Sequence, residues 1–225
     1  MSDTVMLWHG YLQGRADDRL LSESEKCRAA SIRRPEARQQ FVEIRTRVRQ
    51  ILADYTGCTP AELVIERTEL GKPWLPDFPE LFFNLSHCDK YWVLALAAHS
   101  RVGVDLELIR PRKGMAGLVR RCFSVAEQVA WNGLKQEKER HFYQYWTAKE
   151  AFVKAVGRGI ALGLEKVQIS FLPEPCLRDI PAEFGLPEHW RLLSPTLSDN
   201  QVVTLCLETS SVPTLQVRVC NAGAE

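Results

Sequence analysis

The segment from Val102 to Leu108 alternates between apolar residues and others, and this period of two restricts the fold more than any other feature. Successive strand side chains point to opposite faces, so its four apolar residues would face a core while Asp105 and Glu107 project side by side. Two carboxylates so close repel each other unless a cation lies between them. A hard ion such as Mg²⁺ prefers one or two carboxylates together with substrate phosphates. Alone, the pair also fits a solvated strand face.

A second segment, from His141 to Val156, is strongly aromatic and predicts a long helix that stops at Gly157. Glu150 and Lys154 lie one turn apart on the same side of this helix. Such a pair can be a plain surface ion pair, but the neighbouring Trp146 indicates a buried edge. Three carboxylates with a lysine beside them describe a site for a metal ion and a phosphate.

Helix signals occur in both halves of the chain. Ser22 with Glu25, and Ser124 with Glu127, have the spacing of capping boxes. Pro35 suits the first turn of a further helix. Strand patterns cover residues 5–12, 63–66, 82–85, 91–98, 167–171, 202–207 and 215–219. The stretch 71–76, with two prolines, is expected to be irregular, and the stretch 173–187, with four prolines, is expected to be a surface excursion.

Each half therefore reads as strand, helix and further strands. We expect an α+β fold with two similar, tightly packed lobes, residues 1–100 and 101–225, and a site that draws on both. The joint would lie near residues 98–103. No linker-like composition separates the halves.

Composition narrows the partners. Lys and Arg nearly balance Asp and Glu, for a net charge of +1, so no global field draws the chain to nucleic acid or membrane. Seven scattered cysteines show no pairing or zinc spacing, which favours a reduced, cytoplasmic setting. No apolar run approaches the ~20 residues that span a bilayer.

Turn segments supply further candidates. Asn84, Ser86 and His87 close a strand, where they can serve the turn or meet a phosphate. Lys72, between a glycine and a proline, can likewise form a turn or meet an anion. Cys88 beside His87 suggests a nucleophile, but no third partner supports that interpretation.

Taken in order, five motifs resemble the Sfp-like 4′-phosphopantetheinyl transferases, from about residue 20 to residue 171. They are Glu25-Lys26-x-Arg28, Gly71-Lys72-Pro73, Asn84-Leu85-Ser86-His87, Gly103-Val104-Asp105-Leu106-Glu107 and Trp146-x-x-Lys149-Glu150-x-x-x-Lys154. Each motif is weak alone, whereas five in this order are specific. The chain beyond Phe171 carries nothing diagnostic.

The resemblance implies two α/β lobes related by a pseudo-twofold, with coenzyme A in the cleft between them. It implies transfer of 4′-phosphopantetheine to a serine of an apo acyl, peptidyl or aryl carrier protein, releasing adenosine 3′,5′-bisphosphate. By position, Mg²⁺ would be held by Asp105, Glu107 and Glu150. Coenzyme A would be contacted by Arg28, Lys72, Asn84, Ser86, His87 and Lys154. Catalysis would rest on Glu150, as the best general-base candidate, and on the fixed charge of Lys154.

Two other classes stay open. The same carboxylates could serve a Mg²⁺-dependent nucleotide hydrolase. The basic tract from Arg28 to Arg49 could serve a non-enzymatic RNA-binding module, although aromatic residues are not interleaved in it. Because both halves lie in one chain, we expect a monomer. The pathway of the carrier protein and the tolerance for acylated coenzyme A are not readable from the sequence.

Overall fold

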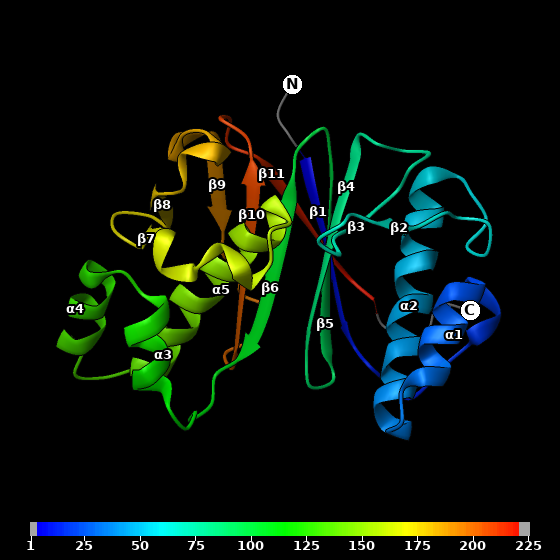
Figure 1. Ribbon diagram of the computed structural model, residues 1–225, viewed down its shortest axis with the longest axis horizontal. Coiled ribbons are helices and arrows are strands. Elements are labelled where there is room, and N and C mark those ends of the chain that lie inside the picture. Colours follow the sequence, from blue (N-terminus) through cyan, green and yellow to red (C-terminus); the bar gives the residue numbers. More distant parts are fainter. Residues whose placement is uncertain (1–3, 221–225) are drawn as a thin grey trace.

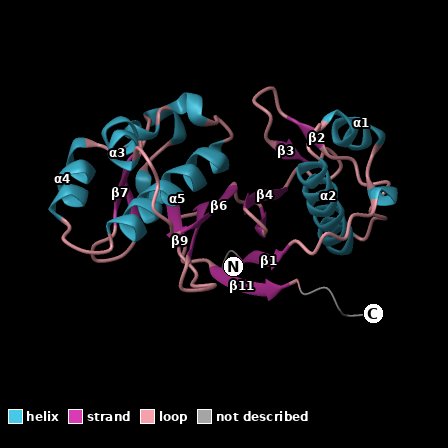
Figure 2. Cartoon of the chain, turned by 90° about the horizontal axis from the view of Figure 1, so that it is seen from below, coloured by secondary structure: helices cyan, strands magenta, loops and turns pink. Residues whose placement is uncertain are grey.

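A computed structural model describes residues 4–220 as two packed sheets between two groups of helices (Figures 1 and 2). Helix α2 covers the outer side of one sheet, with α1 packed on α2, and α3, α4 and α5 lie beyond the other sheet. The mixed architecture confirms the predicted α+β class. None of the described helices combines the length and the apolar character needed to cross a membrane.

The first half contains two helices and five strands, listed here with their bounds: β1 (Thr4–Tyr11), α1 (Glu23–Ser31), α2 (Pro35–Thr56), β2 (Glu66–Arg67), β3 (Pro73–Trp74), β4 (Leu81–Cys88) and β5 (Tyr91–Ala98). Both helix starts follow the sequence signals. Ser22 and Glu25 form a capping box at α1, and Pro35 occupies the first turn of α2.

The second half contains three helices and six strands: β6 (Val102–Leu108), α3 (Met115–Cys122), α4 (Val125–Gly133), α5 (Lys138–Val156), β7 (Gln168–Ser170), β8 (Cys176–Asp179), β9 (Trp190–Leu193), β10 (Gln201–Glu208) and β11 (Thr214–Val219). Short 3₁₀ turns lie at Asp18–Leu20, Ile160–Leu162, Leu164–Lys166, Ala182–Phe184 and Pro187–His189. Ser124 and Glu127 form the predicted capping box at α4.

The two main sheets repeat one strand order. The first reads β11-β1-β5-β4 and the second β6-β10-β9. In the first, β1 pairs antiparallel with β5, which pairs antiparallel with β4, and in the second β6 pairs antiparallel with β10, which pairs antiparallel with β9. This repeat agrees with two similar lobes.

The last strand departs from that pattern. β11 pairs in parallel with β1, so a strand from beyond residue 200 completes the sheet of the first lobe. β11 is therefore an exception to the predicted assignment of residues 101–225 to the second lobe. The division near residue 100 itself stays a prediction.

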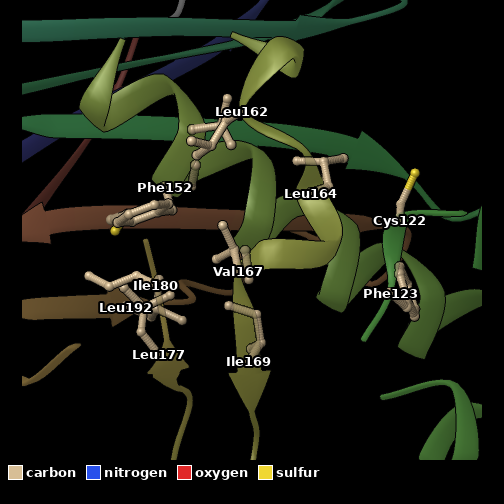
Figure 3. Packing of buried hydrophobic residues seen from close by; sticks show 14 of the residues in the cluster. Cys122, Phe123, Phe152, Leu162, Leu164, Val167, Ile169, Leu177, Ile180 and Leu192 are labelled. Atoms are coloured by element: carbon tan, nitrogen blue, oxygen red, sulfur yellow. The ribbon is translucent and has the colours of Figure 1, made fainter. Parts of the chain in front are cut away.

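Three apolar cores hold these layers together. One lies between α2 and the first sheet, one lies between the two sheets, and the third surrounds α5. Figure 3 shows part of the third, where Phe152 of α5 lies among Ile180, Leu192 and Leu177. Burying such side chains stabilises the fold by roughly 1.5–3 kcal/mol each.

Helix α5 lies directly on β6 at Gly103. A Cβ atom there would collide with the carbonyl oxygen of Ala151 and the amide nitrogen of Ala155. The glycine thus lets the helix backbone touch the strand, and this contact fixes the carboxylates of both elements relative to each other.

Two expectations for irregular and extended segments were wrong. The strand expected at 63–66 lies at Glu66–Arg67 and pairs with Pro73–Trp74, inside a stretch expected to be irregular. A two-residue edge pairing tolerates the proline because only one of its sides is hydrogen-bonded. The stretch 173–187, expected as a surface excursion, contains β8, which pairs with β7.

Candidate active site

The predicted carboxylates lie where β6, α5 and β4 meet. Lys154 of α5 places its Nζ 2.6 Å from Asp105 Oδ1, 3.0 Å from Ser86 Oγ and 3.2 Å from the carbonyl oxygen of Val104. Ser86 Oγ also donates to Asp105 Oδ1 at 2.8 Å. The structure therefore brings one residue from α5 and one from β4 onto a single carboxylate of β6.

Two carboxylate oxygens of this cluster lack partners. Among the described residues, Asp105 Oδ2 and Glu150 Oε1 are buried side-chain oxygens without a hydrogen bond. Burial, and then the charge of Asp105, raises the pKa of Glu150 to about 7. The same two causes raise the pKa of Glu107. The cluster is thus short of positive charge, because among the described residues its one ion pair joins Lys154 to Asp105, and Arg110 and Arg112 act on Glu107 only without contact.

This shortage is what a cation would relieve. The donors are hard carboxylate oxygens of the kind Mg²⁺ prefers, and two of them are free to accept a bond. Within residues 4–220, no three His, Cys, Asp or Glu side chains already stand as a ready-made metal site. The residues fit Mg²⁺ in their chemistry, and binding would draw the carboxylates together.

Asn84 and Ser86 join the two sheets. Asn84 Oδ1 accepts from the Val104 amide at 2.9 Å, and Ser86 Oγ accepts from the Leu106 amide at 3.2 Å. Both side chains are buried in β4 and replace a main-chain ladder between β4 and β6. Their predicted contact with coenzyme A stays a prediction, and each has a structural task beside it.

His87 and Cys88 follow on β4 with opposite settings. His87 lies at the surface, and its partial burial and the charge of Lys154 lower its pKa. Cys88 is buried, with its Sγ donating to Glu107 Oε2 at 3.5 Å. Burial raises the pKa of its thiol to about 11. A thiol so hard to ionise is a poor nucleophile, so the Cys/His interpretation gains no support.

The two predicted basic contacts lie elsewhere. Lys72 donates to the carbonyl oxygens of Ala155 at 2.6 Å and Val102 at 3.2 Å. Arg28 lines a pocket of about 560 Å³ together with Arg45, Arg67 and Pro73. The guanidinium groups of Arg28 and Arg45 lie 5.9 and 5.5 Å from the ring centre of Phe41.

The sequence had not singled out Arg67, and it had treated Arg45 only as part of a basic tract. The structure divides that tract. Arg49 is buried, with its Nε 2.6 Å from Glu25 Oε2, whereas Arg45 and Arg28 face the pocket. Arg67 is separated from them by the loop after α2, and only folding brings it to the same wall.

Two family models match this chain. The model described as the 4′-phosphopantetheinyl transferase superfamily matches residues 101–206, and that described as 4′-phosphopantetheinyl transferase, N-terminal, matches residues 16–99. Together they include all the candidate residues above.

Individual relatives agree with these matches. The 4′-phosphopantetheinyl transferase HetI of Nostoc sp. is 35% identical over 218 residues, which cover 92% of this chain and 89% of that protein. The 4′-phosphopantetheinyl transferase ffp of Bacillus subtilis is 30% identical over 178 residues, covering 76% and 75%. A solved holo-(acyl-carrier-protein) synthase of Bacillus anthracis, in complex with CoA (3′,5′-ADP), has a TM-score of 0.40 and 23% identity over 49% of this chain and 96% of that one.

Proposed function

Because the chain belongs to the 4′-phosphopantetheinyl transferase superfamily, we propose that it moves 4′-phosphopantetheine from coenzyme A to a serine of an apo carrier protein. The observation that carries this proposal is the cluster of Asp105, Glu107, Glu150 and Lys154, which holds two unpartnered carboxylate oxygens. Such a cluster suits a substrate whose pyrophosphate arrives with a cation.

Asp105, Glu107 and Glu150 would hold Mg²⁺, which when bound neutralises charge on the pyrophosphate. Lys154 adds a fixed positive charge beside Asp105, where it would meet a phosphate oxygen of coenzyme A. The carrier serine Oγ attacks the phosphorus on the pantetheine side. The bond to the bridging oxygen breaks, and adenosine 3′,5′-bisphosphate leaves with that oxygen.

Glu150 is proposed to take the proton of the serine hydroxyl. A general base works best when its pKa lies close to the working pH. Burial and the charge of Asp105 raise the pKa of Glu150 to about 7, and its Oε1 has no competing hydrogen bond. The carboxylate is therefore available and basic enough at neutral pH.

The phosphates of coenzyme A are proposed to meet Arg28, Arg45 and Arg67, which line one pocket. Three guanidinium groups there supply forked donors for phosphate oxygens. His87 and Ser86 would extend this contact towards the carboxylates. Arg49 is buried against Glu25, so the basic tract does not present one continuous face for RNA.

The acceptor is proposed to be an acyl, peptidyl or aryl carrier domain, and the enzyme to act as a cytoplasmic monomer. An exposed basic segment supports an acidic partner. It contains Arg110, Arg112, Lys113, Arg120 and Arg121, close in sequence to β6.

The test is incubation with coenzyme A, Mg²⁺ and several apo carrier proteins, read by intact mass. We expect one carrier to gain the mass of a single phosphopantetheine, with adenosine 3′,5′-bisphosphate released and no reaction in EDTA. Asp105→Ala should abolish transfer, while Asp54→Ala, at an exposed carboxylate of α2, serves as the matched control. Release of phosphate from nucleotides without a carrier would instead identify a hydrolase.

A further inference from the structure

Lys72 belongs to the first lobe, but the hydrogen bonds of its side chain go to the second lobe. Its ammonium donates to Ala155 in the last turn of α5 and to Val102 at the start of β6. These are two of the places where helix and strand backbones run together, beside Gly103. One side chain therefore contacts both elements that carry the acidic cluster.

The loop that carries Lys72 is itself well fixed. Thr68 and Lys72 exchange two hydrogen bonds: the Thr68 amide donates to the Lys72 carbonyl at 2.9 Å, and the Lys72 amide donates to Thr68 Oγ1 at 3.1 Å. Gly71 takes the left-handed conformation, with φ of 86°, that the turn requires. The lysine thus extends from a preorganised turn.

The stem of Lys72 is also packed. A Cβ atom at Gly157 would lie 3.1 Å from Lys72 Cδ, so the stem runs over the glycine that ends α5. An ammonium at the last carbonyls of a helix interacts favourably with the helix dipole. Position, packing and charge all direct this group at the end of α5.

Among residues 4–220, no carboxylate forms an ion pair with this ammonium. Burial, and then the charge of Arg101, lowers the pKa of Lys72 to about 8. The carboxylate of Glu208 is already paired with Arg101. Cys206, which also acts on Lys72, lies on the same strand as Glu208. An ammonium held mainly by carbonyl oxygens and packing has little freedom to turn toward the pocket of Arg28.

We propose that Lys72 is a positioning residue, which ties the first lobe to the α5–β6 unit and so sets the acidic cluster against the coenzyme A pocket. This role replaces direct phosphate binding by Lys72, and it rests on the proposed transfer reaction. Misplacing a reacting group by about 1 Å can cost ~10²-fold in rate.

Steady-state kinetics separate the two roles. Lys72→Met keeps the packed stem and removes the ammonium. A positioning role predicts that kcat falls by roughly 10–10²-fold while KM for coenzyme A stays near the wild-type value. Partial recovery of kcat in Lys72→Arg is expected, because a cation again reaches the two carbonyls. Glu69→Gln, at an exposed neighbour in the same loop, is the matched control.

A phosphate ligand predicts the reverse, with raised KM and retained kcat, and that result would overturn the proposal. Unchanged kcat and KM in Lys72→Met would overturn it as well. Loss of transfer in the wild-type protein would count against the proposed function, not against the tie.

A second measurement needs neither a variant nor turnover. Amine labelling of the folded wild-type protein, followed by peptide mass mapping, should find the same extent of labelling at Lys72 with and without coenzyme A. The exposed Lys113 should likewise react equally in both samples. Suppression of Lys72 labelling by coenzyme A would show a ligand contact and overturn the proposal.

Discussion

In both lobes, the glutamate that caps a short helix also forms an ion pair with a buried cation on the long helix that follows. In the first lobe, Glu25 of α1 accepts from Arg49 of α2 at 2.6 Å. In the second, Glu127 of α4 lies 2.8 Å from the Nζ of Lys149 of α5. Each cation then donates to two carbonyl oxygens of the loop after its own helix: Pro60 and Leu63 for Arg49, and Leu164 and Val167 for Lys149.

The two long helices also end alike, at Gly57 and Gly157, each in the left-handed conformation. Arg49 and Lys149 lie about two turns before those ends. The residue after the cation is Gln50 in the first lobe and Glu150 in the second. The same buried pair therefore supports a neutral amide in one lobe and an acid in the other.

The lobes also differ in how deeply the pair is buried. Each glutamate accepts three hydrogen bonds. The side chain of Glu127 is 3% exposed, whereas that of Glu25 is 13% exposed. The more deeply buried pair lies beside the residue with the unpartnered oxygen, so a satisfied cluster holds an unsatisfied one in place.

The largest expected effect comes from removing the difference between the lobes at Glu150. Glu150→Gln gives it the amide found at Gln50 and removes the proton acceptor. Turnover should fall by roughly 10²–10⁴-fold and stay low at saturating Mg²⁺. The measurement is a Mg²⁺ titration of transfer to apo carrier protein, with folding checked by circular dichroism.

Gln50→Ala provides the matched control at the corresponding place in α2, and its turnover should stay at the wild-type value. Recovery of Glu150→Gln at high Mg²⁺ would remove Glu150 from the base role and leave it only as a metal ligand.

The next effect concerns the buried pairs. Glu127→Gln leaves Lys149 buried without its counter-charge, and we expect the free energy of unfolding to fall by about 3–5 kcal/mol. Glu25→Gln should cost less, because its carboxylate is partly solvated. Denaturant titration of the two variants compares the lobes directly.

A double variant checks the cause. Glu127→Leu with Lys149→Met removes both charges, and its loss should be much smaller than the sum of the single losses. Equal losses from Glu25→Gln and Glu127→Gln would show that burial does not distinguish the two pairs.

The smallest effect is a pH dependence of stability, measured without metal. The pKa of Glu150 is raised by folding, so its contribution is fully present below its ordinary pKa and is lost as pH rises to about 7. Unfolding titrations in EDTA at pH 5 and pH 8 should show this loss, on the order of 1–3 kcal/mol.

Glu150→Gln should have the flatter profile of the two proteins, and added Mg²⁺ should flatten the wild-type profile. Equal slopes in the variant and the wild-type protein would assign the dependence to other groups, with Glu107 as the first to examine.

Local signals predicted much of this fold. Both capping boxes, the proline start of α2 and the strand at 102–108 depend on neighbours within four residues, and all are confirmed. Gly103 lies in that strand, and α5 packs directly on its backbone. The spacing of Asp105 and Glu107 placed both on one strand.

Long-range partners were not readable. The bonds from Asn84 and Ser86 to β6, and from Lys72 to α5, join residues at least 20 positions apart. The ion pair that Arg49 and Lys149 each form with a capping glutamate was also not predictable, because the two halves use different cations in different local sequences. Tertiary packing decides such contacts, and no periodic pattern encodes them.

The parallel pairing of β11 with β1 has a consequence for synthesis of the chain. Val5 lies opposite Leu215, so the first sheet lacks an edge strand until the residues of β11 have left the ribosome. Contacts this distant in sequence close late and slow the search for the native state. During that interval β1 presents an open edge, which is a template for association with other nascent chains. The second sheet does not include β11, so all its strands can pair before the first sheet gains its edge strand.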